Sequence, residues 1–255
     1  MEIIFLGSGS FFSIASVNYH SNILIRDPRN KKYLLLDCGY DIRHSLHEQG
    51  FTYKEITDIY ISHLHGDHAG GLEYIGFSHR FSKGKVKPNL FVSEHLETKL
   101  WENCLSGSMS TLEDEKAALD TYFCPNVISD KDKNFHWNGI DFELVQADHT
   151  MNDKFVNYCY GLFFTLNETD IYLTSDTKFR PDLYMDYYKK ADLIFHDCEV
   201  AENRSGVHSN YKDLLTLPED IRKKLWLYHY DSEHLPSAEE DGMKGFVKKG
   251  QRFSF

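Results

Sequence analysis

Short apolar runs bounded by turn residues recur along the chain, and such runs predict the strands of a buried β-sheet. In the first half they fall at residues 3–6, 22–25, 33–36 and 58–61, and in the second half at 140–146, 158–166, 171–174, 193–195 and 225–228. Apolar residues spaced three and four apart predict helices after Ala69 and over 41–49, 94–105, 181–190 and 211–217. This mixture predicts a layered α/β protein, whose strand order periodicity does not give.

The chain has 255 residues, of which 41% are hydrophobic, and this is enough for a sizeable core. No linker-like, low-complexity or repeated segment divides it, so we expect a single domain over residues 1–255. The first residues lack the basic flank of a signal peptide, and no apolar run approaches the length of a membrane span. The five cysteines form no Cys-x-x-Cys pair, which favours reduced thiols and a cytoplasmic location.

A formal net charge of −11 argues against broad attraction to a nucleic-acid backbone, because such binding usually depends on clustered Lys and Arg. The densest basic stretch, residues 80–87, is more typical of a solvated loop than of a nucleic-acid handle. We therefore expect a small substrate, with no stable nucleic-acid or membrane partner. Fourteen histidines are many for this length, but only their spacing can give them a chemical meaning.

Three histidines and a carboxylate lie within six positions, directly where the apolar run 58–61 ends. Zinc takes neutral imidazole and carboxylate ligands, and alternate residues of an extended segment, such as His63 and His65, point the same way. Asp67 and His68 remain for a second ion. The glycines of this run would let the backbone turn tightly around such ions. The alternative, a histidine-rich loop without metal, is disfavoured by the density of ligand types.

The string HLHGDH at residues 63–68 resembles the HxHxDH signature of the metallo-β-lactamase superfamily. The resemblance implies an αβ/βα four-layer sandwich, in which helices flank two mixed β-sheets and metal ions lie at one edge. The family also places a histidine, an aspartate and a final histidine after later strands, and His149, Asp176 and His229 fit these places. Taken singly, either histidine would more often be structural and the aspartate could equally cap a turn, but their order follows the family pattern.

The resemblance implies two sets of metal ligands that share one carboxylate. The residues implied are His63, His65 and His149 for one ion, Asp67, His68 and His229 for the other, and Asp176 for both. These ligand types suit Zn²⁺, and Mn²⁺ can occupy such sites. Two adjacent divalent ions would lower the pKa of a shared water, and they would change the formal charge from −11 to −11 + 4 = −7.

Further strings resemble the RNase Z and cyclic-phosphodiesterase group of this superfamily. They are LGSGS at 6–10, ADLIFHDCE at 191–199 and SGVHSNY at 205–211. In that group a carboxylate after a strand orients a histidine that serves as general acid. The resemblance implies that Asp197 holds His208 as an imidazolium, which donates a proton to the departing alkoxide. The expected catalytic residues are therefore Asp67, Asp197 and His208, although His208 could instead cap a helix that begins near Ser209.

Over nearly its whole length the chain resembles the phage and bacterial cyclic-nucleotide phosphodiesterases that counter Pycsar defence, a system that signals with cyclic CMP and cyclic UMP. The strings NYHSNILI at 18–25, LLLDCGYDIR at 34–43 and KLWLYHYD at 224–231 carry this resemblance. It implies hydrolysis of 3′,5′-cyclic nucleotides to 5′-monophosphates, with cyclic CMP and UMP foremost and cyclic AMP and GMP as further candidates. It also implies a homodimer, and a host-cytoplasmic location if the protein comes from a phage.

Phe11, Phe12 and Tyr19 lie in the loop that faces the metals in this family, where they could stack on a nucleobase, although a core or dimer-interface role is at least as common. Cys38 and Cys198 are interpreted as small buried residues and not as nucleophiles.

Two other functions remain open. The first is an RNase Z-like tRNA 3′-processing nuclease or another small cyclic-phosphate hydrolase. The acidic charge and the lack of a basic Gly/Pro-rich arm disfavour the nuclease. The other is a non-catalytic metal-binding domain, which the presence of all seven ligands disfavours.

Overall fold

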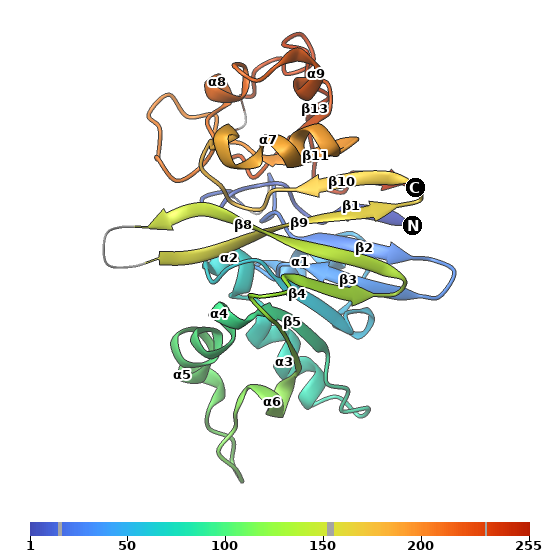
Figure 1. Cartoon of the computed structure of the whole chain (residues 1–255). Coiled ribbons are helices and arrows are strands. Elements are labelled where there is room, and N and C mark those ends of the chain that lie inside the picture. Colours follow the sequence, from blue (N-terminus) through green and yellow to red (C-terminus); the bar gives the residue numbers. More distant parts are fainter. Residues whose placement is uncertain (15–16, 152–155, 233) are drawn as a thin grey trace.

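Two β-sheets lie across the middle of the molecule (Figure 1). The computed structural model describes residues 1–14, 17–151, 156–232 and 234–255, and within these each sheet has seven strands. The first sheet has the order β14-β1-β2-β3-β4-β5-β6, and the second has the order β13-β12-β11-β10-β9-β8-β7. The strands of the first sheet are β1 (Glu2–Phe5), β2 (Ile23–Asp27), β3 (Lys32–Leu36), β4 (Asp58–Ile61), β5 (Asn89–Ser93), β6 (Cys124–Ile128) and β14 (Arg252–Ser254). Those of the second are β7 (Asn134–Trp137), β8 (Ile140–Met151), β9 (Val156–Leu166), β10 (Thr169–Leu173), β11 (Leu193–Asp197), β12 (Leu225–Tyr228) and β13 (Gly245–Phe246).

Each sheet has an antiparallel half and a parallel half. Strands β14, β1, β2 and β3 pair antiparallel, as do β7, β8, β9 and β10. Strands β3 to β6 pair parallel, as do β10 to β13. Parallel neighbours need crossover connections, and these usually contain a helix that covers the sheet.

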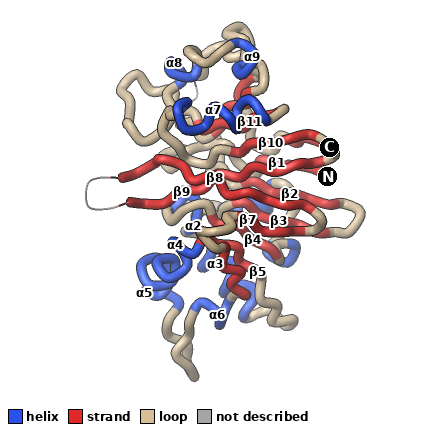
Figure 2. The backbone as a smooth tube through the Cα atoms, in the orientation of Figure 1, coloured by secondary structure: helices blue, strands red, loops and turns tan. Residues whose placement is uncertain are grey.

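Most of the helices lie at the two ends of the molecule, with the sheets between them (Figures 1 and 2). The first half of the chain contributes α1 (Ile42–Glu48), η1 (Tyr53–Glu55), α2 (Gly66–Ala69), α3 (Leu72–Arg80), α4 (Glu94–Lys99), the π-helical η2 (Leu100–Leu105), α5 (Ser106–Met109) and α6 (Leu119–Tyr122). The second half contributes α7 (Pro181–Lys190), α8 (Tyr211–Leu214) and α9 (Glu219–Arg222). Among the described residues, every helix is too short or too polar to cross a bilayer.

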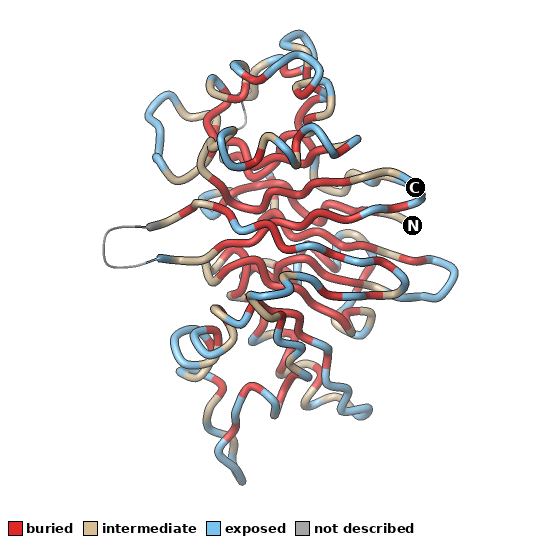
Figure 3. Tube along the Cα trace, in the orientation of Figure 1, coloured by how far each residue is buried: buried red, intermediate tan, exposed pale blue. Residues whose placement is uncertain are grey.

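The core lies between the two sheets, and the central parts of most strands are buried (Figure 3). Aromatic side chains join the layers: the ring centroids of Phe5 on β1 and Phe195 on β11 are 5.0 Å apart, and those of Tyr60 on β4 and Phe135 on β7 are 5.5 Å apart. Each sheet thus buries one face against the other sheet and the opposite face against helices. Two mixed sheets flanked by helices are the fold class predicted from the sequence, and the prediction is confirmed.

Several predicted elements have the bounds expected from the apolar pattern. β4, β12 and α7 match residue for residue, and the other predicted strands match within a few residues. The predicted helix over 94–105 is α4 followed by the wider π-helical turn η2. The predicted helix over 41–49 is α1, but Asp41 does not cap it, because this carboxylate accepts a hydrogen bond from the backbone N–H of His20 at 2.9 Å.

Candidate metal centre

Most of the predicted site residues stand where strands end at one edge of the two sheets. His63 and His65 follow β4, Asp176 follows β10, and His229 follows β12, while Asp197 is the last residue of β11. Each of these four strands has a parallel neighbour. The carboxyl ends of parallel strands meet at one edge, where α/β proteins commonly bind their ligands.

Backbone strain marks the same edge. Asp37, Ser175 and His229 have φ angles of 63°, 53° and 65°, in the left-handed region that residues other than glycine rarely adopt. The surrounding structure holds these conformations in place: the N–H of Asp37 donates to the carbonyl of Tyr60 at 2.8 Å, and that of His229 donates to the carbonyl of Ser8 at 2.8 Å. Strain of this kind is often stored at functional sites, where it fixes the direction of a side chain.

A β-bulge aims His149 at the site. The prediction placed this histidine after a strand, but it lies within β8, at a register shift between Ala147 and Thr150. A bulge adds one residue to one strand and commonly re-aims a side chain beside an active site. The Oη of Tyr184 on α7 stabilises the bulge by accepting a hydrogen bond from the N–H of Asp148 at 2.8 Å.

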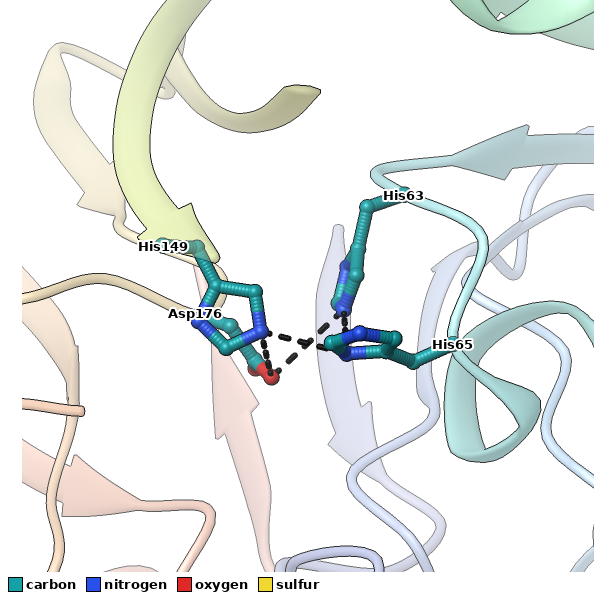
Figure 4. Close-up of side chains that lie close together, drawn as sticks. All are labelled: His63, His65, His149 and Asp176. Carbon is teal, nitrogen blue, oxygen red and sulfur yellow. Dashed lines mark hydrogen bonds and ion pairs between the residues drawn. The ribbon is translucent and has the colours of Figure 1, made fainter. Parts of the chain in front are cut away.

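The structure brings the first predicted set of ligands together (Figure 4). Nδ1 of His65 lies 3.0 Å from Nε2 of His63 and 3.1 Å from Nε2 of His149. Oδ2 of Asp176 lies 3.6 Å from Nε2 of both His63 and His149. Four side chains from β8 and from the segments after β4 and β10 thus point one atom each at a common centre.

The second predicted set converges beside the first. Oδ2 of Asp67 lies 3.2 Å from Nε2 of both His68 and His229. The other oxygen of Asp176, Oδ1, lies 3.3 Å from the same two nitrogens. Asp176 therefore faces the first set with one oxygen and the second set with the other.

These separations suit a tetrahedral metal site. A zinc ion with bonds of about 2.0–2.1 Å holds its four ligand atoms about 3.3 Å apart. The measured separations are 3.0–3.6 Å in the first set and 3.2–3.3 Å in the second. Both sets therefore have the dimensions of a site that can hold a divalent ion.

Buried polar atoms without partners also point to a cation. Among the described residues, Oδ1 of Asp67, Oδ1 of Asp176 and Nε2 of His68 are buried and accept or donate no hydrogen bond. An unsatisfied buried polar atom costs about 1–3 kcal/mol, so native proteins rarely leave several together. A cation at the centre of the second set would satisfy Oδ1 of Asp176 and Nε2 of His68, which both face that centre. The residues present thus fit divalent metal ions.

The far side of each imidazole decides which nitrogen faces the cluster. Nδ1 of His68 lies 2.7 Å from Oδ2 of Asp37, and Nδ1 of His149 lies 2.9 Å from the carbonyl oxygen of Val207. Each acceptor holds the proton on Nδ1, which leaves the lone pair on Nε2 directed at the cluster. Partners of this kind commonly set the tautomer and orientation of metal-binding histidines.

Burial and the neighbouring carboxylates shift the pKa values of the cluster histidines in opposite directions. Burial, with the neighbouring His149, lowers the pKa of His65 to about 4, and burial also lowers the pKa of His63. Burial opposes charge on His229 too, but the carboxylates of Asp176, Asp197 and Asp67 outweigh it and raise its pKa to about 10. A divalent cation would supply the same positive charge at the same place.

His208 stands beside the two ligand sets and is oriented by Asp197. Its Nδ1 lies 2.9 Å from Oδ2 of Asp197. Burial lowers the pKa of His208, but the carboxylates of Asp197 and Asp176 together raise it above its ordinary value. Its ring centroid is 5.0 Å from that of His149 and 4.9 Å from that of His229. The alternative role as a helix cap is wrong, because the side chain of Asn210 caps α8.

A cavity of about 310 Å³ opens onto the cluster, lined by ligand residues, His208, Phe11 and Phe12. Tyr19 does not line it; its ring instead lies 4.8 Å from the ammonium group of Lys249. A larger and more open cavity, of about 570 Å³, shares Phe12 and Asp231 with the first but contains none of the predicted ligands. The smaller cavity is therefore the one that belongs to the chemistry, and two of the three predicted loop aromatics lie in its wall.

Other features singled out in the sequence do not line this cavity. Within the basic stretch 80–87, Arg80 forms an ion pair with Glu115 at 2.6 Å, and Nζ of Lys87 donates to the carbonyl of Asp120 at 2.6 Å. These two cations are thus engaged on the surface, as expected of a solvated loop. Cys38 and Cys198 are fully buried, as predicted.

The glycines of the histidine motif serve close packing. A Cβ atom at Gly66 or Gly70 would lie 2.1–2.2 Å from the ring of Tyr40, and one at Gly71 would lie 2.2 Å from the carbonyl oxygen of Gly39. None of the three motif glycines has a positive φ. The motif forms the single helical turn α2, in which these glycines avoid a Cβ clash without a left-handed conformation.

Three groups that hold the imidazoles were missed by the sequence analysis. Asp37 lies in the string LLLDCGYDIR, which was used only for its resemblance to the family. Its position directly after the predicted strand 33–36 could have identified it as a candidate site residue. The amide nitrogen of Asn157 lies 3.2 Å from Nε2 of His65. When Nδ1 of His65 faces the cluster, Nε2 carries the proton. A flip of the Asn157 amide then presents its oxygen as the acceptor for this proton. The third group is the backbone carbonyl of Val207, for which no sequence signal exists because every residue has a carbonyl.

Comparisons with known proteins agree with this geometry. The family profile described as Anti-Pycsar protein Apyc1 matches residues 1–253. The chain is 32% identical to anti-Pycsar protein Apyc1 of Paenibacillus harenae, covering 90% of each chain, and 29% identical to that of Bacillus phage vB_BsuM-Goe3, covering 98% of this chain and 96% of the relative. Among solved structures it is similar to the metallo-β-lactamase fold protein YhfI from Bacillus subtilis, with a TM-score of 0.73 over 99% of both chains at 16% identity. This last similarity establishes the fold.

Proposed function

Because the chain belongs to the family of anti-Pycsar protein Apyc1, we propose that it is a metal-dependent phosphodiesterase that opens 3′,5′-cyclic nucleotides to 5′-monophosphates. The preferred substrates are cyclic CMP and cyclic UMP, with cyclic AMP and GMP as further candidates. Such an activity would remove the signal on which Pycsar defence depends.

The shared carboxylate of Asp176 carries this proposal. Its two oxygens face two ligand sets, in which the eight separations given above lie between 3.0 and 3.6 Å, close to a tetrahedral edge. When bound, two divalent ions lower the pKa of a water and stabilise the developing charge on phosphoryl oxygens. The residues that would hold them are His63, His65 and His149 on one side, Asp67, His68 and His229 on the other, and Asp176 between.

His208 supplies the proton that the leaving group needs. Its Nδ1 is engaged by Asp197, so its Nε2–H is free to point at the substrate. Hydrolysis forms a bond from the water oxygen to phosphorus and breaks the bond from phosphorus to O3′. The proton from Nε2 of His208 passes to O3′, and the 5′-phosphate stays attached to the nucleoside. A positioned acid of this kind contributes about 100-fold to 10,000-fold to a rate.

The cavity supports a substrate of this size. Its volume of about 310 Å³ falls at the lower end of the range of about 300–1,000 Å³ that is typical of small-molecule sites. Phe11 and Phe12 at its wall offer apolar surface on which a nucleobase can stack. A small cavity and a strongly acidic chain both disfavour the alternative of a tRNA-processing nuclease.

Incubation of purified protein with cyclic CMP, UMP, AMP and GMP, each followed by chromatography of the product, tests the proposal. We expect 5′-monophosphates from at least the two pyrimidine nucleotides, and no product from Asp176→Ala purified in parallel. Inertness toward all four would reject the proposal. A pre-tRNA with a 3′ trailer serves as a further substrate, and its cleavage without cyclic-nucleotide turnover would favour the nuclease.

Metal identity and assembly form part of the proposal. We propose two Zn²⁺ ions per chain, and mass spectrometry of the metals in the purified protein would distinguish them from Mn²⁺. We also propose a homodimer, which the exposed apolar side chains of Phe12, Ile14 and Val17 on one loop support. Light scattering coupled to size exclusion measures the assembly, and a monomeric mass at micromolar concentration would contradict the dimer.

A further inference from the structure

The loop over residues 200–209 makes two separate contacts to the candidate metal centre. The carbonyl oxygen of Val207 lies 2.9 Å from Nδ1 of His149, and Nδ1 of His208 lies 2.9 Å from Oδ2 of Asp197. The first contact orients a candidate metal ligand, and the second places the candidate general acid. Any change in the path of this loop would move both groups together.

The carboxylate of Glu199 is bound to the middle of this loop. Its Oε1 accepts a hydrogen bond from the N–H of Ser205 at 2.8 Å, and its Oε2 accepts one from the Oγ–H of Ser205 at 2.7 Å. Oγ of Ser205 in turn accepts a hydrogen bond from the N–H of Val207 at 3.2 Å. A chain of hydrogen bonds therefore runs from Glu199 through Ser205 to the residue that contacts His149.

The backbone of Glu199 closes the base of the same loop. Its N–H donates to the carbonyl of Ser209 at 2.8 Å, and its carbonyl accepts from the N–H of Tyr211 at 2.8 Å. Residues 202–206 between these ties are exposed, and Gly206 has a φ of 77°. The tip of the loop thus has little packing of its own. Arg204 ties it to Asp213 at 2.8 Å on the surface, and the carboxylate of the buried Glu199 ties it to the protein interior.

We propose that Glu199 is a positioning residue, which holds the 200–209 loop so that Val207 orients His149 and His208 faces the reacting phosphate. The inference rests on the proposed function, because it assigns a role at the same site. A charged acceptor that receives two hydrogen bonds from one serine is a stronger and more directional tie than a neutral one. Glu199 and Ser205 both line the cavity at the metal centre, but each carboxylate oxygen of Glu199 accepts a hydrogen bond from Ser205. We therefore assign Glu199 a role through the loop, and the kcat and KM measurements below distinguish this role from contact with substrate.

The proposal predicts a pattern that separates Glu199 from His208. Loss of His208 removes only the acid, so turnover falls while metal affinity remains. Loss of Glu199 lowers both, because the Val207 carbonyl and the His208 imidazole move together. Partners that orient a metal ligand typically change metal affinity or activity about 10-fold to 100-fold, and we expect about a tenfold effect for a residue one step further away.

The test compares Glu199→Gln with the wild type in three measurements. Zn²⁺ affinity is measured by competition with a chromogenic chelator, kcat and KM are measured at saturating Zn²⁺, and the melting temperature is measured without metal. We expect about tenfold weaker Zn²⁺ binding and a lower kcat, with KM little changed and the metal-free melting temperature close to that of the wild type. Ser205→Ala should reproduce these effects, and the double variant should be no worse than the single ones, because both cut the same chain of hydrogen bonds.

Glu202→Gln is the matched control, since Glu202 lies exposed in the same loop and its side chain makes no hydrogen bond or ion pair with any described residue. Equal Zn²⁺ affinity and kcat in Glu199→Gln and Glu202→Gln would overturn the proposal, and so would a change confined to KM, which would indicate substrate contact. If Glu199→Gln fails to fold, Ser205→Ala decides by the same criteria. A wild-type chain that binds no Zn²⁺ would reject the proposed function itself. Equal Zn²⁺ binding by the wild type and Glu199→Gln would reject only the role of Glu199.

Discussion

At the scale of single residues, the chemistry of this site depends on which nitrogen of each imidazole carries a proton. An imidazole binds a metal only through its unprotonated nitrogen. Here the opposite nitrogen of His68 faces a carboxylate, and that of His149 faces a backbone carbonyl. These partners have fixed positions in the fold, so Nε2 of each ring is directed at the cluster before any ion binds.

Asp37→Asn should weaken metal binding at the set that contains His68. Asparagine tolerates the φ of 63° at this position, so the backbone needs no change, but a neutral amide is a weaker acceptor for His68 Nδ1–H. We expect about a 10-fold to 100-fold loss of Zn²⁺ affinity, measured by chelator competition. Asp141→Asn is the control, because Asp141 pairs with His136 at 2.7 Å on the surface, and an equal effect of the two variants would contradict the prediction.

His208→Ala should slow turnover and leave the metals in place. The imidazole lies beside both ligand sets but supplies an atom to neither set of four described above, so metal content per chain should match the wild type. Loss of a positioned acid should lower kcat about 100-fold or more. Steady-state kinetics and metal analysis of the same preparation measure both effects, and unchanged kcat would remove His208 from the mechanism.

At the scale of elements, most of the site residues follow ordinary strand ends, and one depends on an irregularity. The bulge in β8 turns His149 toward the cluster, and it is held from outside by Tyr184 on α7. A regular strand alternates its side chains strictly, so His149 would not keep this direction if the extra residue were absent. A helix that covers the sheet thus takes part in forming the site.

Tyr184→Phe should therefore affect both stability and metal affinity. The change leaves the N–H of Asp148 without its acceptor, which should lower the free energy of unfolding by about 1–3 kcal/mol in urea titrations. Zn²⁺ affinity should fall as well, because the bulge carries His149. Tyr187→Phe on the same helix is the control, since its hydroxyl donates to Glu143 at the surface, and the prediction fails if the two variants behave alike.

Elements with a dense apolar run were predicted well, and elements without one were missed. β4 and β12 are short but almost wholly buried, so their sequences are nearly continuous apolar runs. β6 lies at the edge of the first sheet and four of its five residues are not buried, so its sequence carries no such run. Its partner β5 is an exception, because its buried apolar run over residues 90–92 was not predicted as a strand. The four-residue β7 has only two buried residues and was also missed.

At the scale of the whole molecule, the candidate metal centre joins the two sheets. His63 to His68 come from the first sheet, and the other ligands come from the second. A metal ion bound there would connect the two halves of the chain. Ions that bind only the folded state stabilise it in proportion to the logarithm of their concentration.

Removal of metal should therefore lower the melting temperature of the whole chain. At a free Zn²⁺ concentration of 100 times Kd the stabilisation is about 2.7 kcal/mol, which corresponds to a shift of roughly 5–10 °C for a domain of this size. Scanning calorimetry with and without a chelator measures this shift. Asp176→Ala, which lacks the shared ligand, should melt at the same temperature under both conditions, and a wild type that is equally insensitive would contradict the prediction.

The expected single domain also has a test at this scale. One large buried cluster contains residues from both sheets, and β1 pairs with β14 from the other end of the chain. We expect one cooperative transition in urea, with tryptophan fluorescence and far-ultraviolet circular dichroism changing together. Two separated transitions would show that the halves unfold independently.

The sequence by itself determined the fold class and the candidate ligands. Four candidate ligand residues within six positions are a local pattern, and a strand followed by one helical turn is enough to bring them together. The later ligands could be placed because each one stands at or just beyond an apolar run. Because the family places its later ligands after successive strands, the order of these runs was enough to select His149, Asp176 and His229 from the many histidines and aspartates of the chain.

Only the tertiary structure decided how each ligand is oriented. The acceptors that fix the imidazoles are 31 positions away for His68, 58 for His149 and 92 for His65. One of them is the backbone carbonyl of Val207, which lies on the loop that is hydrogen-bonded to Glu199. Such contacts arise when distant segments pack, so no local pattern encodes them, and the protonated nitrogen of each histidine is therefore a property of the folded chain.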